Sequence, residues 1–130
     1  MQEQLKYDDI TRRIIGCAMR VHTKLGNGFQ DVVYQRSVEI EMILEGLSFE
    51  REKEMKIYYR EIEVGTRRVD FFVENIVLVE LKALIELEDV HLSQALNYLE
   101  AYNNEIGLLI NFGSKSLTFK RLLNKKFKPQ

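Results

Sequence analysis

The segment Ile76–Ala83 places the strongest constraint on the fold of this chain. It begins with four large apolar residues, three of them β-branched, and then carries Glu80 and Lys82. Such a run is typical of a strand that is covered on both faces. Because side chains alternate along a strand, Glu80 and Lys82 project to the same side of it. Burying two charges is costly unless they are paired or bind a metal, so the segment predicts a functional site.

Length and composition predict a single globular domain over residues 1–130, with a basic tail at about 122–130. A chain of 130 residues buries roughly two thirds of its unfolded surface in one core. The 45% apolar and 30% charged residues exclude a disordered chain, and no apolar run approaches the ~18 residues that span a membrane. The polar N-terminus lacks the apolar segment of a secretory signal, so we expect a cytoplasmic protein.

The formal net charge of −1 excludes a global field that attracts nucleic acid. The stretch from Ser114 to Gln130 differs, because it holds basic residues and no acid. We interpret it either as a solvated tail or as a patch that contacts phosphate. The single cysteine, Cys17, excludes an internal disulfide and a thiolate metal cluster. Its position on the apolar face of a predicted helix indicates a buried side chain.

The spacing of apolar residues predicts three helices and five strands in the order α-α-β-β-β-α-β-β. The helices are expected at about residues 8–25, 30–45 and 88–102, the first capped by Asp8 or Asp9 and the second ended by Gly46. The strands are expected at about residues 47–59, 62–73, 76–83, 106–110 and 117–122, the first two interrupted near residue 54 and at Gly65. The strand-helix-strand segment from Ile76 to Phe112 predicts a right-handed crossover between two parallel strands in an otherwise antiparallel sheet.

A hairpin through Glu74-Asn75 brings two carboxylates together. Counting outward from that turn places Asp70 within one residue of Glu80 on the neighbouring strand. Mg²⁺ prefers oxygen ligands at about 2.1 Å, which two carboxylates, a backbone carbonyl such as that of Leu81 and water can supply. Lys82 beside the ion can stabilise the negative charge that develops when a phosphodiester is attacked.

Asp70, followed by Glu80, Leu81 and Lys82, resembles the Asp…Glu-x-Lys signature of the PD-(D/E)XK nuclease superfamily. The segment Gly28–Tyr34 resembles the motif that names the GxxExxY family, a branch of small proteins in that superfamily. Other segments that match this family are Val21–Gly26, Arg68–Asp70, His91–Leu99 and Gly107–Gly113. The matches span about residues 10–121, and an ordered set is more specific than the signature spacing alone.

The resemblance implies an α/β fold, with a restriction-endonuclease-like mixed β-sheet flanked by helices, and a metal-dependent phosphodiesterase site. By this resemblance, Asp70 and Glu80 would hold Mg²⁺ or Mn²⁺, and Lys82 would act at the scissile phosphate. Gln94, on the following helix, would orient water or Lys82. Asp31 stands where the family has a glutamate, and would be a further, shorter acid for the metal.

Four weaker candidates for substrate contact are Arg68, Tyr34, Lys120 and Arg121. Several candidates also have structural alternatives. Glu80 with Lys82 can form a structural ion pair at a strand end. Asp31 can cap a helix, and Tyr34 can be a core aromatic. A structural role is likewise open for four further side chains: Gln94, Arg68, His22 and His91.

The expected function is metal-dependent hydrolysis of phosphodiester bonds in DNA or RNA, and we expect the chain to be an enzyme. The residues at its centre are Asp70, Glu80 and Lys82. The alternative is a catalytically weak or inactive nuclease-like module that binds nucleic acid or protein. Either function is compatible with a homodimer, and no membrane partner is expected.

Overall fold

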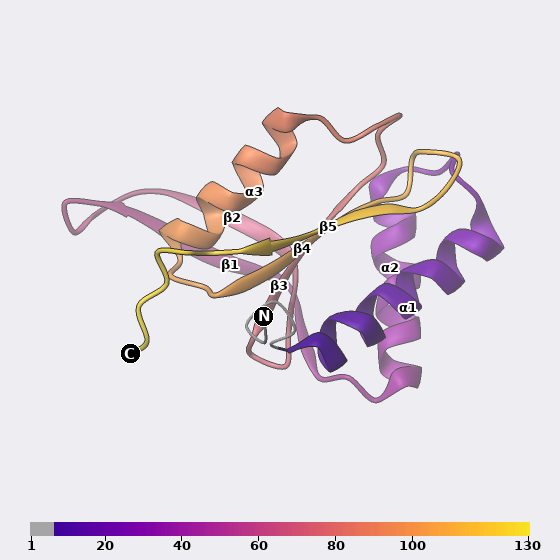
Figure 1. The fold of residues 1–130 in the computed structure, drawn as a ribbon, viewed down its shortest axis with the longest axis horizontal. Helices are drawn as coiled ribbons and strands as arrows, with labels where there is room; N and C mark the ends of the chain where they lie inside the picture. The colour runs from indigo at the N-terminus through magenta and orange to yellow at the C-terminus, as the bar shows by residue number, and fades with distance from the viewer. Residues whose placement is uncertain (1–6) are drawn as a thin grey trace.

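A five-stranded sheet forms the centre of the molecule in a computed structural model that describes residues 7–130 (Figure 1). The strands lie in the order β1-β2-β3-β4-β5, with the bounds Phe49–Tyr59, Ile62–Val73, Val77–Lys82, Ile106–Asn111 and Thr118–Leu123. β3 and β4 are parallel, and the other neighbours are antiparallel. The predicted mixed sheet and the predicted order of elements are therefore confirmed.

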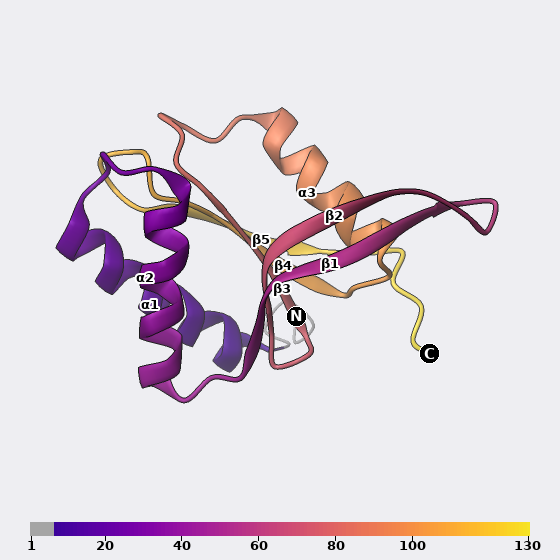
Figure 2. The ribbon, with the colours of Figure 1, turned by 180° about the vertical axis from the view of Figure 1, so that it is seen from behind.

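Helices cover both faces of the sheet (Figures 1 and 2). α1 (Asp8–Leu25) and α2 (Asp31–Glu45) pack on one face, and α3 (Asp89–Ala101) packs on the other. The core under α1 and α2 is the larger one, and includes Ile14, Cys17, Tyr34, Val38, Phe71, Val79 and Ile110. The smaller core under α3 contains Val69, Leu78 and Leu99. No helix within residues 7–130 combines the length and apolarity that crossing a bilayer requires.

The helix ends follow the sequence closely, with one correction. Gly46 follows α2 with a φ of 81°, the left-handed conformation expected of a terminator. Asp8 and Asp9 do not cap α1 from outside, because the helix already begins at Asp8, after Tyr7. Both acids lie in the first turn, where a negative charge suits the positive end of the helix dipole.

β1 and β2 form one long ribbon rather than the interrupted strands that the sequence predicts. They pair from Phe49↔Val73 to Tyr59↔Ile62, and the irregularity near Gly65 is a register shift inside the ladder. The turn into β3 is also longer than predicted, since Glu74, Asn75 and Ile76 separate the strands. Glu74 and Asn75 have φ values of 54° and 56°, as turns matched to the twist of a hairpin require.

The ribbon leaves the sheet at Asp70. β2 pairs with β3 only from Phe71 to Val73, and the rest of the ribbon projects from the body (Figures 1 and 2). The alternation of side chains changes at the same point, because Val69 joins the core under α3 while Phe71 joins the core under α1 and α2. Glu52, which stands across from Asp70, has a φ of 53°. Irregularities of this kind are common beside functional sites, and this one lies between the pairs Arg51↔Phe71 and Lys53↔Val69, next to Asp70.

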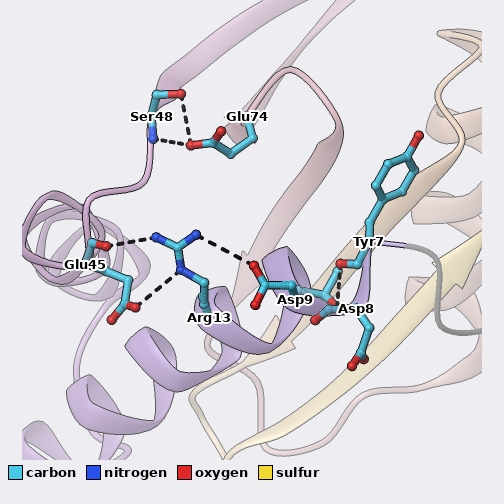
Figure 3. A network of polar contacts seen from close by, with 8 residues as sticks. Tyr7, Asp8, Asp9, Arg13, Glu45, Ser48 and Glu74 are labelled. Atoms are coloured by element: carbon cyan, nitrogen blue, oxygen red, sulfur yellow. Dashed lines mark hydrogen bonds and ion pairs between the residues drawn. The ribbon is translucent and has the colours of Figure 1, made fainter.

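Arg13 ties the two helices of one layer together (Figure 3). Its Nη2 donates to the Glu45 carbonyl at 2.9 Å, and its Nε lies 3.4 Å from the Glu45 carboxylate. In the same region the backbone N–H and hydroxyl of Ser48 donate to Glu74 at 2.7 and 3.1 Å. These contacts hold the end of α2 and the β2–β3 turn in place, and so fix how α2 lies over the sheet.

Candidate active site

Glu80 and Lys82 lie on the face of β3 that α3 covers. The alternating residues Val77, Val79 and Leu81 belong to the core under α1 and α2. Glu80 and Lys82 instead line a small pocket together with residues of α3. Glu80 and Lys82 therefore project to the same side of β3, as the alternation in the sequence predicts.

Asp70 lies where the β2–β3 ladder ends. The last printed pair is Phe71↔Val79, so the next position in the same register sets Asp70 across from Glu80. One carboxylate oxygen of Asp70 accepts from the Leu81 N–H at 2.8 Å. The other accepts from the side-chain amide of Gln35, on α2, at 2.7 Å. Two donors from two elements thus hold the carboxylate at the fork between β2 and β3.

Glu80 is a buried acid with one basic partner. It is 8% exposed, and its Oε2 lies 3.2 Å from Nη2 of Arg67. Its Oε1 is buried and has no hydrogen-bond partner among the described residues. Burial, and after it the nearby charge of Asp70, raise the pKa of Glu80 to about 8 against the opposing effect of Arg67. Because the charge of Asp70 disfavours the ionised form of Glu80, a cation placed between the two side chains would be stabilised there.

Side chains of α3 and β2 form the wall around Glu80. The pocket is lined by Arg67, Glu80, Lys82, His91, Gln94, Ala95, Tyr98 and Leu109. The guanidinium of Arg67 lies over the ring of Tyr98, 5.1 Å from its centroid. His91 accepts from the Glu88 N–H at 3.0 Å, as part of the capping box of α3. The His91 side chain therefore has a structural role at the start of α3, which the sequence analysis left open.

The residues present fit a hard divalent cation. Mg²⁺ commonly binds through one or two carboxylates and keeps several water molecules. Asp70 and Glu80 supply two carboxylates, and the unpaired, buried Oε1 of Glu80 is a free oxygen donor within the described chain. No cluster of three or more His, Cys, Asp and Glu side chains suited to a metal occurs in residues 7–130. Asp70 and Glu80 are the two acids that the fold brings together, and backbone oxygen and water can supply further ligands.

Asp31 does not stand with the other acids. It is exposed at the first position of α2, after Gln30. Gln35, one turn later on the same side of the helix, is the residue that reaches Asp70. Asp31 therefore lies in the first turn of α2, where its charge suits the helix dipole, but it does not cap the helix, and its metal role stays a prediction.

The weaker substrate candidates divide into three groups. Tyr34 is a correction: it is fully buried, its hydroxyl donates to the Gly26 carbonyl at 2.6 Å, and its ring stacks on Phe112. A side chain so enclosed cannot contact substrate, so its role is in the core. Arg121 is paired with Asp8 at 3.0 Å. Arg68 and Lys120 are exposed.

Gln35 and Arg67 are the two site residues that the sequence reasoning missed. Gln35 left a signal, since it is a polar residue on the buried side of the predicted helix over residues 30–45, beside Tyr34 and Val38. For Arg67, the sequence holds no signal that distinguishes it from its neighbour Arg68. Only the fold shows that Arg67, rather than its neighbour, points under α3 toward Glu80.

Comparisons with known proteins bear on the family and the fold of the chain. A family model described as "PD-(D/E)XK nuclease superfamily" matches residues 8–122. The crystal structure of the protein SSO0001 is similar with a TM-score of 0.57 and 14% sequence identity. That similarity covers 93% of this chain and 61% of the other, so the chain spans under two thirds of that structure's length. At this identity the likeness shows a shared fold, consistent with a restriction-endonuclease-like architecture. No curated protein matches the chain.

Proposed function

The chain belongs to the PD-(D/E)XK nuclease superfamily, and from this membership we propose that it hydrolyses phosphodiester bonds in DNA or RNA with Mg²⁺ or Mn²⁺. The observation that supports the proposal best is the meeting of Asp70 and Glu80 at the end of the β2–β3 ladder, with Lys82 in the same wall. We further propose that the chain belongs to the GxxExxY branch, on the basis of its sequence motifs.

Asp70 and Glu80 are the residues that would hold the metal, with the Leu81 carbonyl as a third oxygen donor. A bound divalent ion supplies Lewis-acid stabilisation of charge on the phosphate. Gln35 and the Leu81 N–H orient the Asp70 carboxylate through their hydrogen bonds. A carboxylate held by two donors presents its remaining lone pairs in a fixed direction, which favours metal binding.

Lys82 and Gln94 are the residues proposed to act on the substrate. Both line the pocket that contains Glu80. The ammonium of Lys82 would stabilise the negative charge that develops on the scissile phosphate. The amide of the exposed Gln94 would orient the attacking water or Lys82. Asp31, on the Gln35 side of α2, is proposed only as an outer acid of the site.

The test is cleavage of labelled single- and double-stranded DNA and RNA by the purified protein in Mn²⁺. Lys82→Ala and Asp70→Asn are expected to abolish cleavage, because they remove a substrate-stabilising charge and a metal ligand. Lys56→Ala is the matched control, since Lys56 is exposed on the projecting ribbon. Cleavage that persists unchanged in Lys82→Ala would show that the activity arises elsewhere.

A second candidate is a nuclease-like module that binds nucleic acid without cutting it. Two features favour it: the described residues provide only two converging acids, and Arg67 already pairs with Glu80. Such a module predicts salt-dependent binding that survives Glu80→Gln, with no cleavage in either metal. Fluorescence anisotropy over a salt series, run beside the cleavage assay, separates the two candidates.

A further inference from the structure

The outward face of α2 carries apolar side chains where a surface helix is usually polar. We call this face the α2 stripe, and it consists of Val32, Arg36, Ile40, Ile43 and Leu44. The spacing of three and four residues sets them on one side of the helix, opposite the buried residues of α2. The four aliphatic side chains are between 52% and 76% exposed. A helix that is apolar all round is typical of one buried on both sides, so the α2 stripe indicates a partner that covers it.

The free end of the β1–β2 ribbon is a second apolar surface. We call residues 58–64 the ribbon tip, and its apolar members, each between 58% and 68% exposed, are Tyr58, Tyr59, Ile62 and Val64. Arg60 and Glu61 form the turn between the two strands. The ribbon tip extends beyond the helices on either face of the sheet (Figures 1 and 2). Because a lone two-stranded ribbon is only marginally stable in water, this end is also expected to pack on a partner.

The α2 stripe and the ribbon tip lie at opposite ends of the ribbon. α2 stands at the base, because Gln35 donates to Asp70 where the ribbon leaves the sheet. In the same place the Glu39 carboxylate of α2 lies 3.5 Å from Nε of Arg51 on β1. The tip lies about eight residues further on, or roughly 26 Å at the rise of an extended strand. One chain therefore cannot cover its own α2 stripe with its own ribbon tip, and Figure 2 shows the two surfaces on opposite sides of the molecule. Two ribbons that run side by side in opposite directions would place each tip at the base of the other.

The charges of the two surfaces are complementary. The α2 stripe holds a single charge, that of Arg36. The ribbon tip holds one arginine and two glutamates between residues 58 and 64, a net charge of −1. Neither Arg36 nor Glu61 forms an ion pair within residues 7–130. An ion pair between Glu61 of one chain and Arg36 of another would fix the register of an otherwise apolar contact.

The composition of the ribbon favours a protein partner over nucleic acid. Residues 55–66, its outer part, hold two basic and two acidic residues and so carry no net charge. A ribbon that binds nucleic acid needs an excess of basic residues for phosphate. Tyrosine, arginine and aliphatic side chains with few charges are instead typical of the centre of a protein interface. A second copy of the chain accounts for both surfaces, because it supplies a ribbon tip for each α2 stripe and a stripe for each tip.

We infer that two copies of the chain form a two-fold dimer in which the ribbon tip of each packs on the α2 stripe of the other. The same contact occurs twice in such a dimer and leaves neither surface open to a third copy. The inference goes beyond the proposed function and does not depend on it. It also sets the two candidate sites, which lie at the bases of the two ribbons, about one ribbon length or roughly 26 Å apart.

The experiment measures the mass of the full chain by sedimentation equilibrium at concentrations up to about 200 µM, above the Kd range of interfaces of standard size. The unmodified protein should approach twice its chain mass of 15.4 kDa. Ile40→Gln in the α2 stripe and Ile62→Gln in the ribbon tip should each raise the Kd of the dimer about tenfold or more, because each change acts in both contacts. Met19→Gln makes the same kind of change at an exposed residue of α1, outside both surfaces, and should leave the Kd unchanged.

An exchange of charges separates an effect on the contact from an effect on folding. Arg36→Glu and Glu61→Arg should each weaken the dimer about fivefold or more, and the double variant should regain affinity because the ion pair is restored with its signs reversed. A double variant that binds no better than the single ones would refute the contact between tip and stripe. A dimer weakened by Ile40→Gln but not by Ile62→Gln would mean that the α2 stripes pair with each other, and the exchange of ribbons would be wrong. An unmodified protein that stays monomeric at about 200 µM would overturn the dimer itself.

Discussion

Glu80 combines three conditions that an ionised carboxylate avoids: burial, a second acid nearby, and an oxygen without a partner among the described residues. Arg67 offsets part of this cost through one contact of 3.2 Å. A side chain of this kind lowers the stability of the metal-free protein, since desolvation of a charge exceeds what a single ion pair returns. Such a cost is typical of a position kept for chemistry rather than for folding.

The first prediction concerns the pH dependence of stability without metal. The pKa of Glu80 is about 8 in the folded protein against an ordinary value of 4.5, so folded protein keeps a proton that the unfolded chain releases between these pH values. The stabilising effect of that proton is present below about pH 4.5 and is lost as the pH rises to about 8. The loss approaches roughly 1.4 kcal/mol per pH unit.

Glu80→Gln should remove this part of the pH dependence, because glutamine does not titrate. The measurement is urea unfolding in EDTA at pH values from 5 to 8, followed by circular dichroism. Glu63→Gln is the control, since Glu63 is exposed on the ribbon. Parallel curves for the unmodified protein and Glu80→Gln would contradict the raised pKa.

The second prediction concerns Arg67, which places a positive charge beside the carboxylates that a metal needs. Removing that charge should strengthen Mn²⁺ binding about tenfold, or about 1.4 kcal/mol, because a positive charge in contact with a metal-binding carboxylate repels the cation. Isothermal titration calorimetry of Arg67→Gln gives the affinity directly. Arg68→Gln removes the same charge one position away, on an exposed side chain, and should leave the affinity unchanged. Equal affinities of the two variants would mean that Arg67 does not compete with the metal.

At the scale of elements, the sequence predicts the order and approximate bounds of the helices and strands because apolar periodicity and turn residues are local properties. The run Ile76–Val79 and the helical spacing around Cys17 both depend on nearest neighbours along the chain. The positions of Asp70 and Gln35 depend instead on where the β1–β2 ribbon leaves the sheet. That departure arises from pairing between distant segments and the positive φ of Glu52, neither of which leaves a local pattern.

The third prediction concerns the contact between the β4–β5 hairpin and the segment before α3. A Cβ on Gly113 would lie 2.3 and 2.4 Å from the backbone oxygen and nitrogen of Leu84, and backbone atoms cannot move aside as a flexible side chain can. Gly113→Ala should therefore destabilise the protein by about 2 kcal/mol, as overpacking does. The hydrogen bonds between Asn111 and Leu84 should weaken with it.

Urea unfolding at fixed pH measures the effect of Gly113→Ala. Gly28→Ala is the control, because no atom lies within 4 Å of a Cβ built at Gly28. A loss of stability in Gly113→Ala that matches the control would show that the two segments separate without cost.

At the scale of the whole molecule, two cores of unequal size share one sheet. The large core under α1 and α2 contains no residue of α3, and the small core under α3 holds three fully packed members. Elements with fewer buried contacts open locally at lower free energy than the main core does. The pocket around Glu80 lies on the α3 side of the sheet, next to the small core. We therefore expect this side to open locally at lower free energy than the α1–α2 layer, which lets the candidate site adjust to a substrate.

The fourth prediction uses Cys17 to measure this difference. Cys17 is the only cysteine, it is fully buried in the large core, and burial raises its pKa to about 11. A thiol that is both enclosed and protonated at neutral pH does not react with a disulfide reagent until the core opens. The rate of Cys17 labelling in the native protein at pH 8 should therefore follow global unfolding. A metal that stabilises the fold should slow this rate by the factor by which it lowers the unfolded population.

Hydrogen exchange at amides of α3 should be faster than labelling of Cys17 at equal urea concentration. If Cys17 reacts rapidly in the absence of urea, α1 opens independently of the sheet and the ranking of the two layers is reversed.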